Sequence, residues 1–468
     1  MRPMSLQPTR TQEEIDAFRR SLAGRSVAVI GAGRSGMACL RRLVEAGAEV
    51  TLADAQPRDS LAEVLDEAQG LGAHLVTGFE RFQQIEGVSL VVSSPGVAWE
   101  HQSLVAARLR GVEVIGTLEL AWRLCPAPVI GVTGTNGKGT TCRLIAAMLA
   151  EAGIEHILAG NIGNPLADEL TRASASTPAV VEISSFQLEG VDQFRPRVAT
   201  VLNIAPDHLD RHPSFEAYRA AKARIFENQR PEDMAVVNLD DEAARRMAEG
   251  SAARKVTVSL QAQDADATVR EGLILLRLEG KDEEEVCPAH AFGLPGRHHL
   301  TNVLVASAIA RLAGARPEAI AEAIAGYRPP KHHMEIVGEI GGVAFINDSK
   351  ASNPSAALAD LSSMPRPFVA IVGGKDKGAD FAELAKLLRE RPRGVVLIGE
   401  AADRIAALMA GGFQRAESMP EAVRRARETA RPGDAVILAP ACSSFDMFED
   451  YEHRGEVFRE SVRSLQSE

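Results

Sequence analysis

Cysteine is scarce in this chain, and its arrangement excludes two classes of protein. The 468 residues include five cysteines, and none of them forms a Cys-x-x-Cys pair with another. A disulfide framework needs cysteines in pairs, and a structural zinc site needs them at close spacing. We therefore expect free, reduced thiols and a cytoplasmic protein.

Excess positive charge and long apolar runs are also missing. Lys and Arg total 52 against 63 Asp and Glu, which gives a formal net charge of −11. Such a charge disfavours binding to nucleic acid or to an anionic membrane surface. No run approaches the roughly 20 apolar residues that span a bilayer, and residues 1–20 have no apolar segment typical of a signal peptide. We expect a monomer that binds neither nucleic acid nor a membrane.

What the chain does contain is a glycine-rich turn between a strand and a helix. Residues 129–141 read VIGVTGTNGKGTT. In such a turn, backbone N–H groups and the start of the helix face a polyphosphate. Lys138 would supply a positive charge to the β- and γ-phosphates, and Thr140 or Thr141 a hydroxyl to magnesium. The loop is atypical, because Val132 stands where a glycine is usual. An ordinary strand-to-helix turn would not explain a lysine between two glycines.

A second glycine pattern lies near the N-terminus. A strand leads into Gly31-x-Gly33-x-x-Gly36, and the following strand ends at Asp54, 18 positions later. This is the βαβ nucleotide fingerprint, in which the acid meets a ribose hydroxyl. The pattern alone does not establish NAD binding, and the glycines could serve only close helix–strand packing.

The middle of the chain carries polar residues after further predicted strands. Glu182 ends the strand 179–183, and residues 203–210 (NIAPDHLD) follow the next one. A strand-end Glu beside a phosphate loop fits a magnesium ligand. His208 could bind metal or substrate, or could cap a turn. Lys222, on a predicted helix around 215–228, reads by itself as a solvated lysine. Residues 261–285 predict a hairpin at the sheet edge.

The last third repeats the strand–helix rhythm. Four apolar runs begin at Val343, Phe368, Gly394 and Ala435, which favours a parallel sheet. Three of them lead into polar loops, at 347–354, 373–378 and 440–446. The lysines of the second loop suit an anion or a solvated turn. Cys442 in the third could be a nucleophile, but no histidine pattern supplies its base.

These motifs together resemble those of the Mur ligase family. The GTNGKGT stretch marks the wider superfamily, which includes folate ligases. The stretches 182–189 (EISSFQLE), 347–353 (NDSKASN) and 440–446 (PACSSFD) are similar to the glutamate-adding branch. The resemblance starts near residue 24 and leaves about 20 residues as an N-terminal extension.

The resemblance implies an α/β fold of three domains, each built on a mostly parallel sheet. Residues 1–117 would be a Rossmann-like domain for the UDP-linked substrate, and 118–328 a central P-loop ATPase domain. Residues 329–468 would be a Rossmann-like domain that binds ATP and the incoming amino acid. The implied reaction joins D-glutamate to UDP-N-acetylmuramoyl-L-alanine through an acyl phosphate, with ATP consumed, two Mg²⁺ ions and no NAD. It belongs to peptidoglycan synthesis.

The resemblance also implies site residues. The catalytic residues would be Lys138, His208 and Lys222. ATP contacts would come from Gly134, Thr135, Asn136, Gly137, Lys138, Gly139, Thr140, Asn302, His333, Asp348 and Lys350. The other two substrates would contact Ser35, Asp54, Ser94, Gly96, Asn161, His208, Ser352, Lys377, Ser444, Phe445 and Tyr451. The magnesium ligands would be Thr140, Glu182, His208 and Lys222, the last as a carbamate.

Two positions depart from the family pattern. His333 stands where the family usually has an arginine, and His299 where it has an asparagine. Loss of a charge-assisted hydrogen bond costs about 1.5–3 kcal/mol, so we expect weaker ATP binding unless Lys331 substitutes.

Three other functions remain open from the sequence. A folate or other Mur-type ligase would use the same phosphate loop. A nicotinamide-dependent oxidoreductase would explain the first glycine pattern but not Lys138. A nucleotide-binding switch without catalysis would explain Lys138 but not three successive ligand loops.

Overall fold

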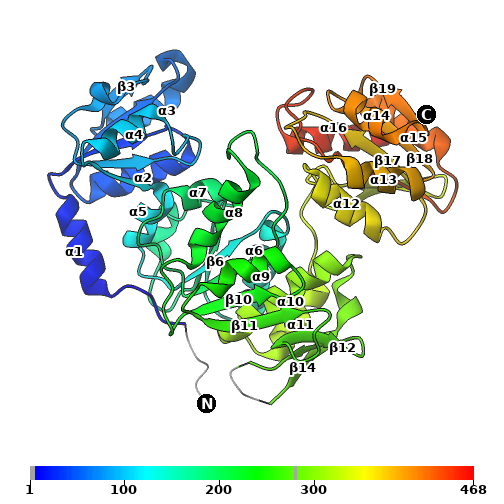
Figure 1. Ribbon diagram of the computed structural model, residues 1–468, viewed down its shortest axis with the longest axis horizontal. Helices are drawn as coiled ribbons and strands as arrows, with labels where there is room; N and C mark the ends of the chain where they lie inside the picture. Colours follow the sequence, from blue (N-terminus) through cyan, green and yellow to red (C-terminus); the bar gives the residue numbers. More distant parts are fainter. Residues whose placement is uncertain (1–5, 279–281, 468) are drawn as a thin grey trace. The chain divides into compact units, whose positions relative to one another are not determined.

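The computed structural model describes residues 6–278 and 282–467. Within them the strands form three sheets, of five, nine and six strands. The sheets fall in sequence order along the chain, as the colours of Figure 1 show. The predicted fold class, α/β with three mostly parallel sheets, is confirmed.

The first sheet is entirely parallel, with the order β3-β2-β1-β4-β5. Its strands are β1 (Ser26–Ile30), β2 (Glu49–Asp54), β3 (His74–Thr77), β4 (Leu90–Ser93) and β5 (Glu113–Gly116). The helices of this part are α1 (Gln12–Leu22), α2 (Arg34–Glu45), η1 (Arg58–Leu61), α3 (Ala62–Gly70), η2 (Phe82–Ile85), α4 (Gln102–Leu109) and α5 (Thr117–Arg123). The strand order reverses between β1 and β4, which is where open α/β sheets bind ligands.

The second sheet has the order β14-β13-β12-β11-β10-β9-β6-β8-β7. Its strands are β6 (Val129–Thr133), β7 (Ile157–Gly160), β8 (Ala179–Glu182), β9 (Val198–Val201), β10 (Met234–Asn238), β11 (Arg254–Ser259), β12 (Ala267–Arg270), β13 (Leu273–Leu276) and β14 (Glu284–Pro288). The helices are α6 (Lys138–Glu151), η3 (Asp168–Arg172), α7 (Ser185–Glu189), α8 (Phe215–Ala223), η4 (Arg224–Phe226), α9 (Glu242–Glu249), η5 (Ala289–Phe292), α10 (Arg297–Leu312) and α11 (Pro317–Gly326).

The position of β6 in this sheet decides the geometry of the phosphate loop. Strand β6 lies between β8 and β9, parallel to both, so the loop after β6 is flanked by the ends of its two neighbours. The predicted edge hairpin is confirmed as β12 and β13, and β14 extends it by a third antiparallel strand.

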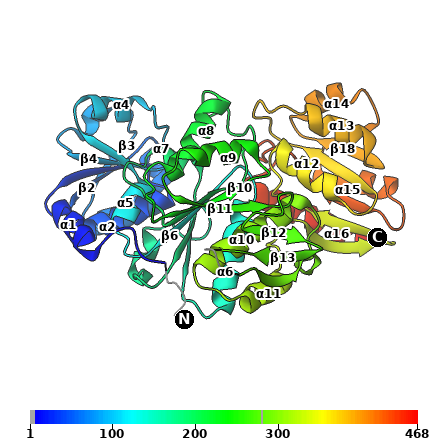
Figure 2. The same cartoon turned by 60° about the horizontal axis from the view of Figure 1, so that its bottom comes forward.

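The third sheet has the order β15-β16-β20-β17-β18-β19 and is parallel except for β15. Its strands are β15 (Glu335–Ile340), β16 (Val343–Asn347), β17 (Phe368–Gly373), β18 (Gly394–Ile398), β19 (Phe413–Ala416) and β20 (Ala435–Leu438). The helices are α12 (Pro354–Ser363), α13 (Ala382–Glu390), α14 (Ala402–Met409), α15 (Met419–Thr429) and α16 (Tyr451–Ser467). Helices α15 and α16 cover one face and α12, α13 and α14 the other (Figures 1 and 2). Strands β16, β20 and β17 are neighbours, so the three predicted ligand loops leave the sheet side by side.

Residue contacts divide the chain into two compact units. The first contains residues up to 204, 216–291 and 302–325, and so includes the first two sheets. The second contains residues 205–215, 292–301 and 326–468. One apolar core, from Leu22 to Ala253 in sequence, runs through both sheets of the first unit. The boundaries near 117 and 328 stay a prediction.

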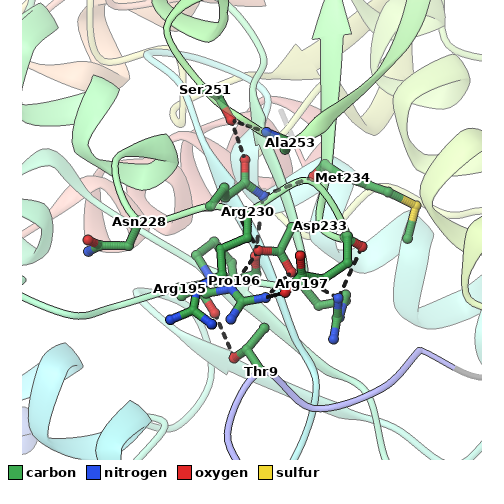
Figure 3. Close-up of polar contacts among 12 residues, drawn as sticks. Thr9, Arg195, Pro196, Arg197, Asn228, Arg230, Asp233, Met234, Ser251 and Ala253 are labelled. Carbon is green, nitrogen blue, oxygen red and sulfur yellow. Dashed lines mark hydrogen bonds and ion pairs between the residues drawn. The ribbon is translucent and has the colours of Figure 1, made fainter.

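The segment before α1 docks on the central part through polar contacts. The Thr9 hydroxyl donates to the Arg195 carbonyl at 2.8 Å (Figure 3). The Arg197 guanidinium donates to the carbonyls of Gln7 and Pro8, at 2.8 and 3.2 Å. Asp233, which is fully buried, binds Arg195 at 2.6 Å. The described part of the N-terminal extension is therefore an ordered piece of the first unit.

In the described part of the chain, every helix falls short of the length or the apolar character that a membrane crossing takes.

Candidate functional site

The phosphate loop connects β6 to α6, as the sequence predicts, and its backbone depends on two glycines. Gly134 and Gly137 have φ angles of +149° and +82°, values that side-chain-bearing residues rarely adopt. A Cβ on Gly137 would overlap the Asn302 side-chain amide. Two hydrogen bonds tie the loop to the end of β9, from Thr135 N to Asn203 O at 3.0 Å and from Asn136 N to Asn203 Oδ1 at 2.9 Å.

Two lysine ammonium groups meet at this loop. Lys138 Nζ donates to the carbonyls of Gly134 and Thr135 at 3.0 and 2.8 Å. Lys222 Nζ donates to the same Gly134 carbonyl at 2.9 Å and to Thr133 Oγ1 at 3.3 Å. It also lies over the Tyr218 ring, 4.8 Å from its centroid. Both ammonium groups therefore lie at the loop and share the Gly134 carbonyl.

The interpretation of Lys222 as a solvated lysine is wrong. Its side chain is 2% exposed, and a buried lysine needs specific partners. Helix α8 is amphipathic, and its face with Tyr218 and Lys222 packs toward the phosphate loop, 88 residues away in sequence. The family motif, and not the local sequence pattern, therefore predicted a functional role for Lys222.

Glu182, at the end of β8, has the chemistry of a cation ligand. It is 4% exposed, and Oε1 accepts a hydrogen bond from Asn161 Nδ2 at 2.9 Å. Its other oxygen, Oε2, is buried without a hydrogen-bond partner. A Cβ added at Gly139, in the first turn of α6, would lie 3.2 Å from Oε2. A buried carboxylate normally has its lone pairs satisfied, so Oε2 fits a magnesium ion held beside Thr140.

A cavity of about 690 Å³ lies at the reversal point of the first sheet, between it and the end of β7. The predicted substrate residues that line it are Ser35, Asp54, Ser94, Gly96 and Asn161. Polar lining residues that the sequence did not single out are Arg34, Gln56, His101 and Gln187. Arg34 lies within the N-terminal glycine pattern and Gln187 within the stretch 182–189, but neither pattern marks these side chains as ligands, and Gln56 and His101 belong to no motif.

The glycines of the N-terminal fingerprint have different roles. A Cβ on Gly36 would overlap the Gly31 carbonyl oxygen, so these two serve close packing of α2 on β1. Gly33 has open space around it and lines the cavity. Asp54 accepts hydrogen bonds from Ala32 N at 2.7 Å and Gln56 N at 2.9 Å, and so fixes the loops around the cavity. Packing alone therefore does not explain the pattern.

His208 belongs to the second unit, and its association with Glu182 and Lys222 stays a prediction. It has a φ of +54°, and its backbone N–H donates to Asp207 Oδ1 at 2.9 Å. Asp207 Oδ2 also accepts from Asn353 Nδ2 at 3.3 Å. The segment 205–215 is thereby held to the loop after β16.

The loops after β16, β17 and β20 carry the remaining predicted residues. Asp348 and Ser444 are buried, Lys377 and Ser352 are half-buried, and Phe445 is 66% exposed. Lys350 Nζ lies 4.7 Å from the centroid of the Tyr451 ring, at the start of α16. Burial raises the pKa of Cys442 to about 12, which makes a thiolate nucleophile there untenable at neutral pH.

Arg454 joins two of these loops and was missed by the sequence. It is 1% exposed on α16, and its guanidinium donates to Ser349 O at 2.8 Å, Ser349 Oγ at 2.9 Å and Cys442 O at 3.0 Å. Burial lowers its pKa to about 10, so it stays charged at neutral pH. Its partners lie 12 and 105 residues away, and no local pattern reveals them.

His333, which replaces the expected arginine, is half-buried with Nδ1 in the interior. Burial lowers its pKa to about 4, so it is neutral at neutral pH and does not restore the missing charge. His299 is 2% exposed, and burial also lowers its pKa. These two rings meet at 5.5 Å between centroids.

Family models match each of the parts of the chain that carry the three sheets. Three family models match: the Mur ligase MurD-like N-terminal domain over residues 25–116, the Mur ligase middle domain over 132–310, and the Mur ligase glutamate ligase domain over 332–442.

Curated relatives match over nearly their whole length. The UDP-N-acetylmuramoylalanine–D-glutamate ligase of Pelotomaculum thermopropionicum is 44% identical over 446 residues, covering 94% of this chain and 98% of that protein. The enzyme of the same name from Koribacter versatilis is 40% identical, covering 94% and 98%.

Solved structures share the fold. They include UDP-N-acetylmuramate–alanine ligase from Thermotoga maritima, with a TM-score of 0.58, 18% identity and coverage of 94% and 99%. MurF from Acinetobacter baumannii has a TM-score of 0.59 and 18% identity, with coverage of 94% and 91%. The identity and coverage of the curated relatives establish that the chain belongs to the Mur ligase family.

Proposed function

We infer that this protein is an ATP-dependent amide-bond ligase that joins D-glutamate to UDP-N-acetylmuramoyl-L-alanine in peptidoglycan synthesis. The observation that carries this is full-length identity of 40–44% to ligases named for that reaction. The UDP-N-acetylmuramate–alanine ligase of Thermotoga maritima, by contrast, matches in fold at 18% identity.

The phosphate loop supports the first step. A free carboxylate is a poor electrophile, so ATP must first convert the terminal carboxylate of the UDP-linked substrate into an acyl phosphate. Phosphoryl transfer depends on positioning and charge neutralisation more than on covalent help from the protein. We assign the positioning and the charge neutralisation of the phosphates to Lys138 and to the backbone N–H groups of the loop. Gly134 and Gly137 permit the conformation of that loop. Bound magnesium would neutralise phosphate charge further, and Glu182 and Thr140 would hold it together with His208.

The amine of D-glutamate then attacks the acyl phosphate, and phosphate leaves. We assign the binding of the amino acid to the loops after β16, β17 and β20, through Ser352, Lys377 and Ser444. The UDP-linked substrate occupies the cavity lined by Ser35, Ser94 and Asn161. Asn302, Asp348 and Lys350 would contact the nucleotide.

We further propose that Lys222 is carbamylated by carbon dioxide and serves as a magnesium ligand. Its burial and its distance of 2.9 Å from the Gly134 carbonyl support a role at the loop. A carbamate keeps one N–H for that hydrogen bond and adds an anionic carboxylate toward a cation.

The assay is phosphate release with ATP, UDP-N-acetylmuramoyl-L-alanine and a panel of amino acids. We expect activity with D-glutamate and not with L-lysine or diaminopimelate. We expect Lys138→Ala to lower turnover by about 10²–10³, the usual effect of removing one preorganised charge contact. Exposed Lys386 on α13 provides the control Lys386→Ala. A response to L-lysine alone, or to a folate substrate, would reject the proposal.

A further inference from the structure

Three residues outside the assigned chemistry gather in the second unit. His298 and His299 lie in the first turn of α10, and Asp360 lies on α12. Asp360 Oδ1 is 3.0 Å from His298 Nε2 and 3.3 Å from His299 Nε2. One ligand atom from each residue lies within 4.8 Å of the others, so all three could contact a single ion.

These distances match the coordination of a small metal ion. Imidazole nitrogen and carboxylate oxygen bind zinc at about 2.0–2.2 Å in a tetrahedron, which places the ligand atoms about 3.3 Å from one another. The two contacts of Asp360 lie at or just below this value. The His298 and His299 rings are neighbours, with centroids 4.0 Å apart.

The hydrogen bonding of the cluster is incomplete. His299 is 2% exposed, yet neither ring nitrogen makes an aligned hydrogen bond, and its contact with Asp360 lacks the right direction. Buried polar groups of folded proteins are normally satisfied, so the unpartnered His299 imidazole indicates a missing ligand.

The charges around the cluster favour a cation. Both imidazoles face the Asp360 carboxyl group, with Oδ1 at 3.0 Å from His298 Nε2 and 3.3 Å from His299 Nε2. The fully buried Asp348 lies next to Asp360, so two carboxyl groups share this interior position. A divalent ion would relieve this crowding of carboxylates. The start of α10 and Lys350 oppose it, since both are positive.

We propose that His298, His299 and Asp360 form a binding site for one divalent transition-metal ion of the zinc type, with water in the fourth position. Two imidazoles and a carboxylate suit zinc, copper or nickel, whereas magnesium prefers oxygen ligands alone. The site is therefore chemically distinct from the magnesium site at Glu182. A bound ion would join the first turn of α10 to α12.

Isothermal titration of the full-length protein with Zn²⁺, in a large excess of Mg²⁺, tests the site. We expect one ion per chain, and at least about 10-fold weaker binding in His298→Gln, by comparison with the losses seen on altering metal sites. The His298 side chain is 33% exposed, so this variant is the least disruptive of the three. The matched control is His290→Gln, which changes an exposed histidine on η5 and should bind as the wild type does.

Cobalt(II) provides an independent measurement. Tetrahedral Co²⁺ absorbs visible light strongly, and octahedral Co²⁺ on scattered surface groups absorbs weakly. We expect the strong bands in the wild type, their loss in His298→Gln, and an added thiolate charge-transfer band in His298→Cys. The proposal fails if the wild type binds no Zn²⁺, if His298→Gln binds it equally well, or if bound Co²⁺ gives only the weak octahedral spectrum.

Discussion

Lys222 is the residue whose proposed chemistry differs most from an ordinary lysine, and it gives a direct test. If Lys222 is carbamylated, activity should rise with added bicarbonate. Lys222→Ala should lose activity by about 10²-fold or more and regain part of it with short carboxylic acids, because these restore an anionic ligand. The measurement is phosphate release. Wild-type rates in Lys222→Ala would contradict the assignment.

Arg454 is expected to position the loops that bind substrate. Arg454→Lys keeps the charge but loses the planar donor set that reaches both Ser349 and Cys442. Each buried carbonyl left without its donor costs about 1–3 kcal/mol. We expect a lower thermal midpoint and a kcat/KM for D-glutamate reduced by about 10-fold or more.

The readout that separates positioning from simple destabilisation is the KM for D-glutamate, measured well below the unfolding temperature. A structural role alone would lower the midpoint and leave KM unchanged. Arg463→Lys, at an exposed position on α16, is the control for the substitution itself.

His333 should make the stability depend on pH. Its pKa is about 4 in the folded protein against an ordinary value of 6.5, so between these values the unfolded chain binds more protons. The contribution of His333 to the free energy of unfolding is therefore complete above pH about 6.5. It is lost as the pH falls toward 4, and the free energy changes by about 1.4 kcal/mol per pH unit at most. We expect His333→Gln to flatten the curve of unfolding free energy against pH over this window. Parallel curves for the two proteins would contradict the burial of a neutral ring.

At the scale of elements, the segment before α1 has a measurable role. Deleting residues 1–10 removes the Thr9 contact to Arg195, two of the three carbonyl partners of Arg197 and the stacking of Arg10 on Trp122. We expect the free energy of unfolding to fall by about 1–3 kcal/mol, with turnover unchanged, because none of these residues lines the cavity or the phosphate loop.

Chemical denaturation measures this loss, and Thr9→Ser, which keeps the hydroxyl, is the control. A fall in turnover at full folding would show instead that the segment acts on catalysis.

Sequence reasoning recognised most strands but missed β3, β5, β7 and β11 in the first two sheets and two strands in the last sheet. The four predicted strands are apolar and buried on both faces, whereas β15 (EIVGEI) is partly exposed and β19 (FQRA) carries polar residues. Both are edge strands, whose pattern is weaker because one side faces solvent.

At the scale of the whole molecule, the two compact units should unfold separately. Phe458 on α16 is fully buried in the second unit, and Phe→Ala in a core costs about 3–5 kcal/mol. We expect scanning calorimetry to resolve two transitions, of which Phe458→Ala lowers one and leaves the other in place. A single transition that moves as a whole would show that the units unfold as one.

The sequence by itself determined the elements that depend on nearby residues. These are the apolar strands, the glycine turns whose φ angles no other residue adopts readily, and the family motifs that place Lys138 and Glu182. Tertiary structure decided what depends on residues distant in the chain: the burial of Lys222, the orphaned oxygen of Glu182, the bridging role of Arg454 and the meeting of His298 and His299 with Asp360. Burial and pKa arise from neighbours that only folding brings together, so a local pattern cannot encode them.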